Sequence, residues 1–357
     1  MGVRRGAFSL ALLVGGVNAA CINMRPPPQP LSAEASAGSP QQIWTTKAGR
    51  GFTGQVALED ETFYGAGVDR KVYAVNLESG AIRWSSRLSG IVGGGLVLSG
   101  DTLFAATSRP QGRVYAIERK LGKQLWRTGT GPISAPLTLY QGVLVVPTQR
   151  GEVLGLDPKT GAIKWRRRVG VARIAATPAD SGALLLATVD SLYLIGASDG
   201  RVIRRALSPG AILSPLVRLG DAFVAGTTDS LVISLRPKDL SLAWRVKVDA
   251  PVFDSPGAIG DTLYAATRRG TLYRIVADSA PQATPVVSLD WPITAPVTIL
   301  DGQILLGGAD GGIRALTPKG EEVWRLQLWR PVEIGPIALT DGLLAMGGDG
   351  DLHRYRK

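Results

Sequence analysis

The stretch at residues 72–84, VYAVNLESGAIRW, decides the fold, because closely related stretches return along the chain. They read VYAIERKLGKQLW at 114–126, VLGLDPKTGAIKW at 153–165 and IRALTPKGEEVW at 313–324. Each combines a short apolar strand, a tight turn that contains glycine, and a second strand that reaches a tryptophan. The sequence therefore repeats a hairpin unit.

The spacing of this unit predicts the architecture. The residues at the end of successive repeats are Trp44, Trp84, Trp126, Trp165, Arg204, Trp244, Pro285 and Trp324. Their separations are 40, 42, 39, 39, 40, 41 and 39 residues. A period near 40 residues that contains only strand-like segments is typical of β-propeller blades. We expect an all-β, eight-bladed propeller of four-stranded antiparallel blades over residues 41–357.

The two ends of the repeat region complement each other. The last unit, 325–357, lacks a final strand, whereas QQIWTTK at 41–47 is a strand without a unit. Because an open ring would expose sheet faces and edges, we expect these segments to complete one blade.

Two kinds of residue serve the repeat itself. The tryptophans are interpreted as apolar plates between blades, and the turn glycines as positions that need positive φ. These structural repeat residues are Trp44, Trp84, Trp126, Trp165, Trp244, Trp324, Gly80 and Gly161.

The N-terminus predicts export. Arg4 and Arg5 precede the apolar segment AFSLALLVGGV at 7–17, and NAAC at 18–21 ends in the single cysteine. We interpret residues 1–20 as a lipoprotein signal peptide, Cys21 as the lipidated residue, and the Pro-, Ala- and Ser-rich residues 21–40 as a flexible tether. The alternative is ordinary cleavage nearby, with Cys21 as an incidental thiol.

Composition excludes several classes of function. The net charge of +11 is spread along the chain without a nucleic-acid-binding motif, so no nucleic-acid partner is predicted. His353 is the single histidine, so neither a catalytic triad nor a metal site with several imidazoles can form. We predict a protein that is not an enzyme and has no metal.

The repeat resembles the PQQ-type propeller repeat, which is named after quinoprotein dehydrogenases. Those enzymes resemble this chain only in the repeat, and their sites use an adjacent pair of cysteines. Since this chain has one cysteine and no long insertions, we expect neither pyrroloquinoline quinone nor another cofactor.

An anchor, a tether and eight such blades together resemble the BamB family of outer-membrane assembly lipoproteins. The resemblance implies a non-enzymatic scaffold of the β-barrel assembly (BAM) machinery, a monomeric propeller within a complex. It would bind POTRA domains of a BamA-like barrel subunit, assist nascent outer-membrane proteins, and lie on the periplasmic face of the outer membrane, attached by its lipid alone. The alternatives are a soluble periplasmic location and a periplasmic or cell-surface ligand-binding or sensor propeller.

The same resemblance implies a partner-binding surface. The family's Leu-x-Leu-Arg stretch matches VGVARIAATP at 169–178, where Arg173 is kept and Ala172 replaces a leucine. The Asp-x-Asp motif of the next blade matches GAILSP at 210–215, where Ile212 replaces an acid. Arg173, Ala172 and Ile212 are therefore the candidate contacts with the partner.

Two tryptophans fall outside the repeat series. Trp291 and Trp329 lie shortly after the Pro285 and Trp324 positions. They are candidates for aromatic contacts at the surface, and the alternative is packing between blades.

Overall fold

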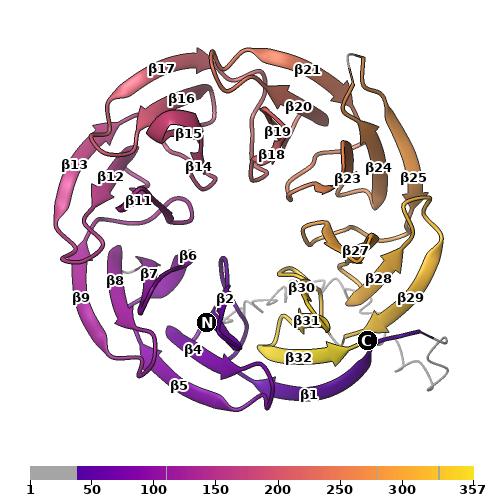
Figure 1. Cartoon of the computed structure of the whole chain (residues 1–357), viewed down its shortest axis with the longest axis horizontal. Helices are drawn as coiled ribbons and strands as arrows, with labels where there is room; N and C mark the ends of the chain where they lie inside the picture. The colour runs from indigo at the N-terminus through magenta and orange to yellow at the C-terminus, as the bar shows by residue number, and fades with distance from the viewer. Residues whose placement is uncertain (1–37, 110, 279, 329) are drawn as a thin grey trace, which may run out of the picture.

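The computed structural model describes residues 38–357 except residues 110, 279 and 329. These residues form eight four-stranded antiparallel sheets arranged as a closed ring (Figure 1). The eight-bladed all-β propeller predicted from the repeat is thus confirmed. The predicted signal peptide, Cys21, most of the tether and Trp329 lie outside the described residues.

The blades are numbered along the chain, and the strands of each run from the ring axis outward, except that the outermost strand of blade 1 is β1. Blade 1 consists of β30 (Ile337–Leu339), β31 (Gly342–Met346), β32 (Asp351–Arg356) and β1 (Gln41–Lys47). Blade 2 consists of β2 (Ala57–Glu59), β3 (Thr62–Ala66), β4 (Lys71–Asn76) and β5 (Ile82–Arg87). Blade 3 consists of β6 (Ile91–Ser99), β7 (Thr102–Arg109), β8 (Arg113–Glu118) and β9 (Gln124–Gly129). Blade 4 consists of β10 (Thr138–Tyr140), β11 (Val143–Pro147), β12 (Glu152–Leu156) and β13 (Ile163–Arg168).

The second half of the ring repeats this order. Blade 5 consists of β14 (Thr177–Pro178), β15 (Ala183–Ala187), β16 (Ser191–Gly196) and β17 (Val202–Leu207), with a short 3-10 helix, Asp180–Gly182, between its first two strands. Blade 6 consists of β18 (Val217–Leu219), β19 (Ala222–Gly226), β20 (Leu231–Leu235) and β21 (Leu242–Lys247). Blade 7 consists of β22 (Gly257–Ile259), β23 (Thr262–Ala266), β24 (Thr271–Val276) and β25 (Ala283–Ser288). Blade 8 consists of β26 (Thr298–Leu300), β27 (Gln303–Gly307), β28 (Gly312–Leu316) and β29 (Glu322–Gln327).

Blade 1 closes the ring. Its outermost strand β1 pairs antiparallel with β32, from Gln41 opposite Arg356 to Lys47 opposite Asp351. The Lys47 ammonium lies 3.1 Å from the Asp351 carboxylate across this pairing. The expectation that strands from both ends of the repeat region share one blade is confirmed, and the two strands lie side by side in Figure 1.

The apolar core lies between adjacent blades. All five residues of β3, β11 and β15 are buried, because each blade is covered on both faces by its neighbours. The outermost strands alternate instead, with exposed positions on every second residue of β5 and β9. The seam has its own core, in which Phe63 and Val75 of blade 2 pack against Leu344 and Met346 of blade 1.

The repeat tryptophans connect neighbouring blades. In four of them the indole N–H donates a hydrogen bond to a carbonyl in the next blade's last turn: Trp44 to Leu77, Trp84 to Arg119, Trp126 to Pro158 and Trp165 to Ala197, at 2.8–3.1 Å. Trp324 instead donates to Gln303 Oε1 of its own blade at 3.1 Å. Gly80 and Gly161 lie in these turns with φ of +72° and +73°. A Cβ at either glycine would meet the preceding tryptophan ring at 2.7 Å or 2.5 Å, so the close approach requires glycine.

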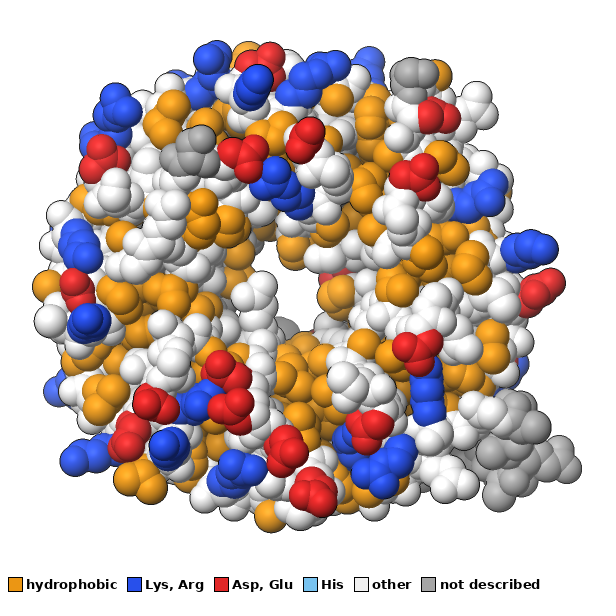
Figure 2. All heavy atoms as spheres, viewed as in Figure 1, with side chains coloured by type: hydrophobic (Ala, Val, Ile, Leu, Met, Phe, Trp, Pro, Cys, Tyr) orange, Lys and Arg blue, Asp and Glu red, His pale blue; other side chains and the backbone are white. Residues whose placement is uncertain are grey.

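The ring has two ends with different loops. The "hairpin end" carries the turns between first and second strands and between third and fourth strands. The "connection end" carries the turns between second and third strands and the connections between blades. On the face shown in Figure 2, hydrophobic side chains line the central opening, while acidic and basic side chains intermingle around it.

Candidate partner-binding surface

The connection from β13 to β14 presents Arg173 at the connection end. The residue is exposed, whereas its neighbours Ala172 and Ile174 are buried at 1% and 3% exposure. Ala172 forms an isolated β-bridge with Thr188, which fixes the backbone on which Arg173 stands. Among the described residues, none forms a hydrogen bond or ion pair with the Arg173 guanidinium. Arg173 is thus a free charge on a rigid loop.

Ile212 occupies the equivalent place in the next connection, from β17 to β18. It is buried at 1% exposure and bridges Thr227 as Ala172 bridges Thr188. Phe52, Ile133 and Ile293 form the same bridge in other blades. Ala172 and Ile212 are therefore anchors of the repeat, and of the three candidate contacts only Arg173 offers its side chain to solvent. The sequence places both residues in connections between blades, but their burial depends on the turns that they bridge.

The loop around Ile212 is held by further hydrogen bonds. Ser214, which is fully buried, accepts a hydrogen bond at its Oγ from the backbone N–H of Gly226 at 2.6 Å. The N–H of Thr228 donates to the carbonyl of Ala211 at 3.0 Å. These contacts connect the loop to blade 6 and keep its shape independent of a bound partner.

Trp291 lies at the same end, between blades 7 and 8. Its half-buried ring packs into the core shared by these blades and faces Gly308, where a Cβ would come within 2.0 Å of the ring. The Arg314 guanidinium lies 5.2 Å from the ring centroid. Most of the indole is thus committed to packing, which is the alternative weighed for it from the sequence.

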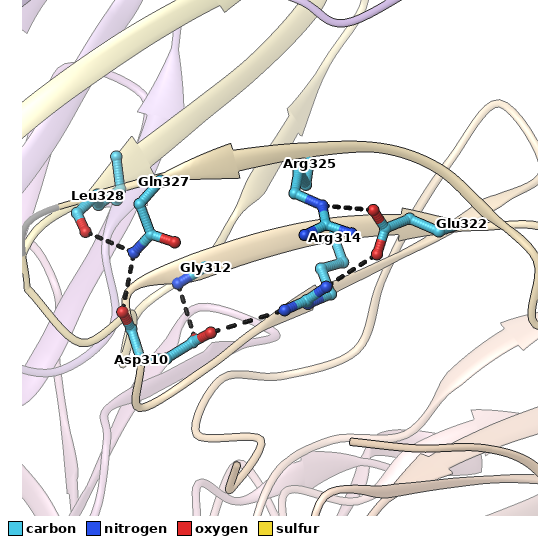
Figure 3. A network of polar contacts seen from close by, with 7 residues as sticks. All are labelled: Asp310, Gly312, Arg314, Glu322, Arg325, Gln327 and Leu328. Atoms are coloured by element: carbon cyan, nitrogen blue, oxygen red, sulfur yellow. Dashed lines mark hydrogen bonds and ion pairs between the residues drawn. The ribbon is translucent and has the colours of Figure 1, made fainter. Parts of the chain in front are cut away.

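Arg314 is itself held by acidic residues (Figure 3). Its guanidinium reaches Glu322 at 2.9 Å and Asp310 at 3.8 Å, and Glu322 also pairs with Arg325. Burial opposes ionisation of Glu322, but hydrogen bonds from Arg314 and Arg325 outweigh it and lower the pKa of that carboxyl. The network keeps the cation over Trp291.

A further cluster at the connection end was not found from the sequence. Arg268 lies 3.2 Å from the Asp254 carboxylate and 5.4 Å from the centroid of Phe253. Burial raises the pKa of Asp254, and the charge of Arg268 acts in the opposite direction. The sequence shows Phe253 and Asp254 side by side in FDSP at 253–256. It does not show their partner, because Arg268 follows only after two further strands.

No group of three or more His, Cys, Asp or Glu side chains among the described residues could hold a metal ion. His353 lies on β32 and is bound to Thr45 at 3.0 Å, stacked on Tyr355. Within the part of the chain that is described, no helix is long and apolar enough to cross a membrane.

Comparison with known proteins places this geometry in context. The family model described as "Outer membrane protein assembly factor BamB" matches residues 33–177. The protein of that name from Burkholderia pseudomallei is 27% identical over 350 residues, covering 96% of this chain and 83% of that protein. The one from Pseudomonas aeruginosa is 30% identical over 177 residues, covering 45% of this chain and 46% of that protein.

Two solved structures share the fold. The crystal structure of BamB from Moraxella catarrhalis superposes with a TM-score of 0.77 at 14% identity, covering 89% of this chain and all of that one. The computationally designed protein Ika8 reaches 0.73, also at 14% identity, over 87% of this chain and 98% of its own. At such identities these likenesses show the fold alone.

The chain is an eight-bladed β-propeller built from PQQ-type repeats. Within that class it is BamB-like, since the family model, the relatives and a solved structure all carry that name.

Proposed function

We propose that this chain acts in the assembly of outer-membrane proteins, as a non-enzymatic scaffold. The proposal is supported by relatives named as outer membrane protein assembly factors. In this role the propeller binds POTRA domains of a BamA-like barrel subunit and assists the insertion of nascent outer-membrane proteins.

One observation carries the partner-binding part: Arg173 is exposed between the buried residues Ala172 and Ile174, and it forms no ion pair with a described residue. Such a residue can form a charge-assisted hydrogen bond without first breaking an ion pair or ordering its loop. Arg150 and Arg269, on turns at the same end of the ring, are also exposed and form no ion pair with a described residue. We infer that the partner surface that meets Arg173 carries carboxylates.

Attachment to the periplasmic face of the outer membrane through a lipid on Cys21 belongs to the same proposal. More than one acyl chain on a processed cysteine holds a protein at a bilayer, whereas one chain binds only marginally. A Cys21→Ala variant should move from the membrane fraction to the soluble periplasmic fraction. Recovery of the unaltered protein in the soluble fraction would contradict the anchor.

Capture from solubilised membranes tests the function directly. The full-length protein carrying a C-terminal tag should recover a POTRA-containing subunit, identified by mass spectrometry. Recovery of a saccharide ligand or a signalling partner, with no POTRA-containing protein, would overturn the proposal and favour the sensor alternative.

A further inference from the structure

A large pocket lies at the hairpin end, between blades 6 and 7. Its volume is about 1010 Å³. Val224, Ser234 and Trp244 lie opposite one another on β19, β20 and β21, so their side chains share the face that looks into the pocket. Asp221 and Asp261, from the first turns of blades 6 and 7, lie at its rim with Ala277.

The equivalent place between blades 2 and 3 is filled by an arginine. The carbonyl of Arg119 accepts a hydrogen bond from Trp84 Nε1 at 2.8 Å, while its guanidinium pairs with Glu59 and with Asp60 at 2.7 Å. Asp101 lies 3.9 Å from the same guanidinium. Arg119 thus satisfies the indole with its backbone and the turn carboxylates with its side chain.

Blade 7 has an alanine at this position. The N–H of Ala277 donates to the carbonyl of Asp261 at 3.0 Å, as the N–H of Arg119 donates to that of Asp101 at 2.9 Å. The methyl group of Ala277 leaves the space of an arginine side chain open.

The groups that bond to Arg119 between blades 2 and 3 nevertheless have counterparts between blades 6 and 7. Asp261 corresponds to Asp101, and Trp244 corresponds to Trp84. On blade 6, Leu219 and Gly220 stand where Glu59 and Asp60 lie, and the carboxylate comes one residue later, from Asp221. No described residue accepts a hydrogen bond from Trp244 Nε1, and none forms an ion pair with Asp221 or Asp261.

Ser234 adds an independent sign of a missing ligand. Its side chain is fully buried, and its Oγ has no hydrogen-bond partner among the described residues. In blades 2 and 3 the residues opposite the tryptophan are Ala74 and Ala116, which need no partner. A buried hydroxyl without a partner is costly, so Ser234 is poised to bond a group that enters the pocket.

The charges at the rim favour a cation. Besides Asp221 and Asp261, the pocket is lined by Asp180 and Asp239 and by two cations, Arg236 and Lys238. Arg218 neutralises Asp180 at 2.9 Å, and Arg236 donates to Ser241 Oγ and to the carbonyl of Leu242. Arg218 also acts on Asp221 through its charge, but neither Asp221 nor Asp261 forms an ion pair with a described residue.

The geometry points to a binding site for an arginine side chain of a partner polypeptide. Its guanidinium pairs with Asp261 and Asp221 beside Trp244, in the space that the Arg119 side chain fills between blades 2 and 3. Since the site lies at the hairpin end, a polypeptide bound here leaves the Arg173 loop at the connection end free. The inference does not depend on the function proposed above.

A synthetic peptide with the sequence of residues 118–122, acetyl-Glu-Arg-Lys-Leu-Gly-amide, tests the site on the folded protein. The indole N–H signal of Trp244, assigned by its loss in Trp244→Phe, should shift saturably in ¹H–¹⁵N NMR spectra. A peptide with citrulline in place of arginine keeps the shape and the lysine but loses the guanidinium charge, so it should cause no saturable shift. Equal shifts with both peptides, or none with either at millimolar concentration, would overturn the proposal.

Variants separate the pocket from general charge effects. Asp261→Asn should weaken peptide binding by about two- to fivefold, the range of a partly exposed ion pair. Asp229→Asn, at the other end of blade 6, is the matched control and should leave binding unchanged. Ala277→Arg should fill the pocket from within, abolish the shift and raise the melting temperature; retained peptide binding in this variant would count against the site.

Discussion

Thr45 on β1 and His353 on β32 meet across the seam of the ring, with Thr45 Oγ1 3.0 Å from His353 Nδ1. The two residues are 308 positions apart in the sequence. Their contact lies in the only described pairing that joins the first strand to the last, so it reports directly on closure of the ring.

The burial of His353 at this seam predicts that the stability of the protein depends on pH. Burial lowers the pKa of His353 below its ordinary value, although Asp351 and Asp349 act in the opposite direction. Because the unfolded chain then binds the proton more readily than the folded one, stability should fall as the pH drops below about 6.5. Thermal melts between pH 7.5 and 5 should show this loss, and His353→Gln should remove much of it. A pH dependence that is the same in His353→Gln would exclude this histidine as its source.

Removal of a repeat tryptophan should destabilise the ring. Trp165 is 9% exposed and donates its indole N–H to the carbonyl of Ala197 at 3.0 Å. Trp165→Ala should lower the free energy of unfolding by about 3–5 kcal/mol, the range for a truncated core aromatic. Trp165→Phe keeps most of the packing and should cost clearly less. Denaturant titrations measure both; similar stability of the alanine variant and the unaltered protein would contradict the packing role.

The turn glycines should differ according to what they face. Gly161 and Gly142 have nearly equal φ angles of +73° and +71°, but only Gly161 has neighbours that an added Cβ would meet, at 2.5 Å from Trp126. Gly142→Ala should cost about 1 kcal/mol for its backbone conformation alone. Gly161→Ala should cost more, because the tryptophan must also move. Equal losses in thermal or denaturant melts would show that the indole contact is unimportant.

Charge reversal at Arg173 should affect binding without affecting folding. The side chain is exposed and forms no hydrogen bond or ion pair with a described residue, so Arg173→Glu should melt at the unaltered temperature. Capture of the POTRA-containing subunit should fall about tenfold or more, since a favourable charge pair becomes repulsive. Arg201→Glu, on an exposed turn at the hairpin end, serves as the control. Undiminished capture by Arg173→Glu would exclude this loop.

The ring was predictable because the same strand and turn pattern recurs in every blade. Eight positions near 40 residues apart define the blades, and the unmatched strand 41–47 defines the seam. The location of Arg173 on a connection between blades was equally accessible from the repeat. These features depend on local strand and turn patterns, which any single repeat already carries.

The fine structure of the surface was not predictable in the same way. Ile212 is buried where it forms a bridge to Thr227. The ring of Trp291 is covered because it packs against Gly308 and lies under Arg314. The pocket at Trp244 becomes visible only when Ala277 is compared with Arg119 at an equivalent hydrogen bond. Such properties arise from contacts between segments that the repeat brings together, and they differ from blade to blade.

The pairing of β1 with β32 also imposes an order on folding. Blades 2 to 8 each take all four strands from one continuous segment, so each can form as soon as its own hairpins are available. Blade 1 cannot, because its outermost strand must wait for three partners from the opposite end of the repeat region. Until they arrive, β1 has a free edge, and the faces of blades 2 and 8 that blade 1 covers remain open to water and to other chains. We therefore expect the seam to be the last contact to form, and the half-made ring before it to be the stage most exposed to aggregation.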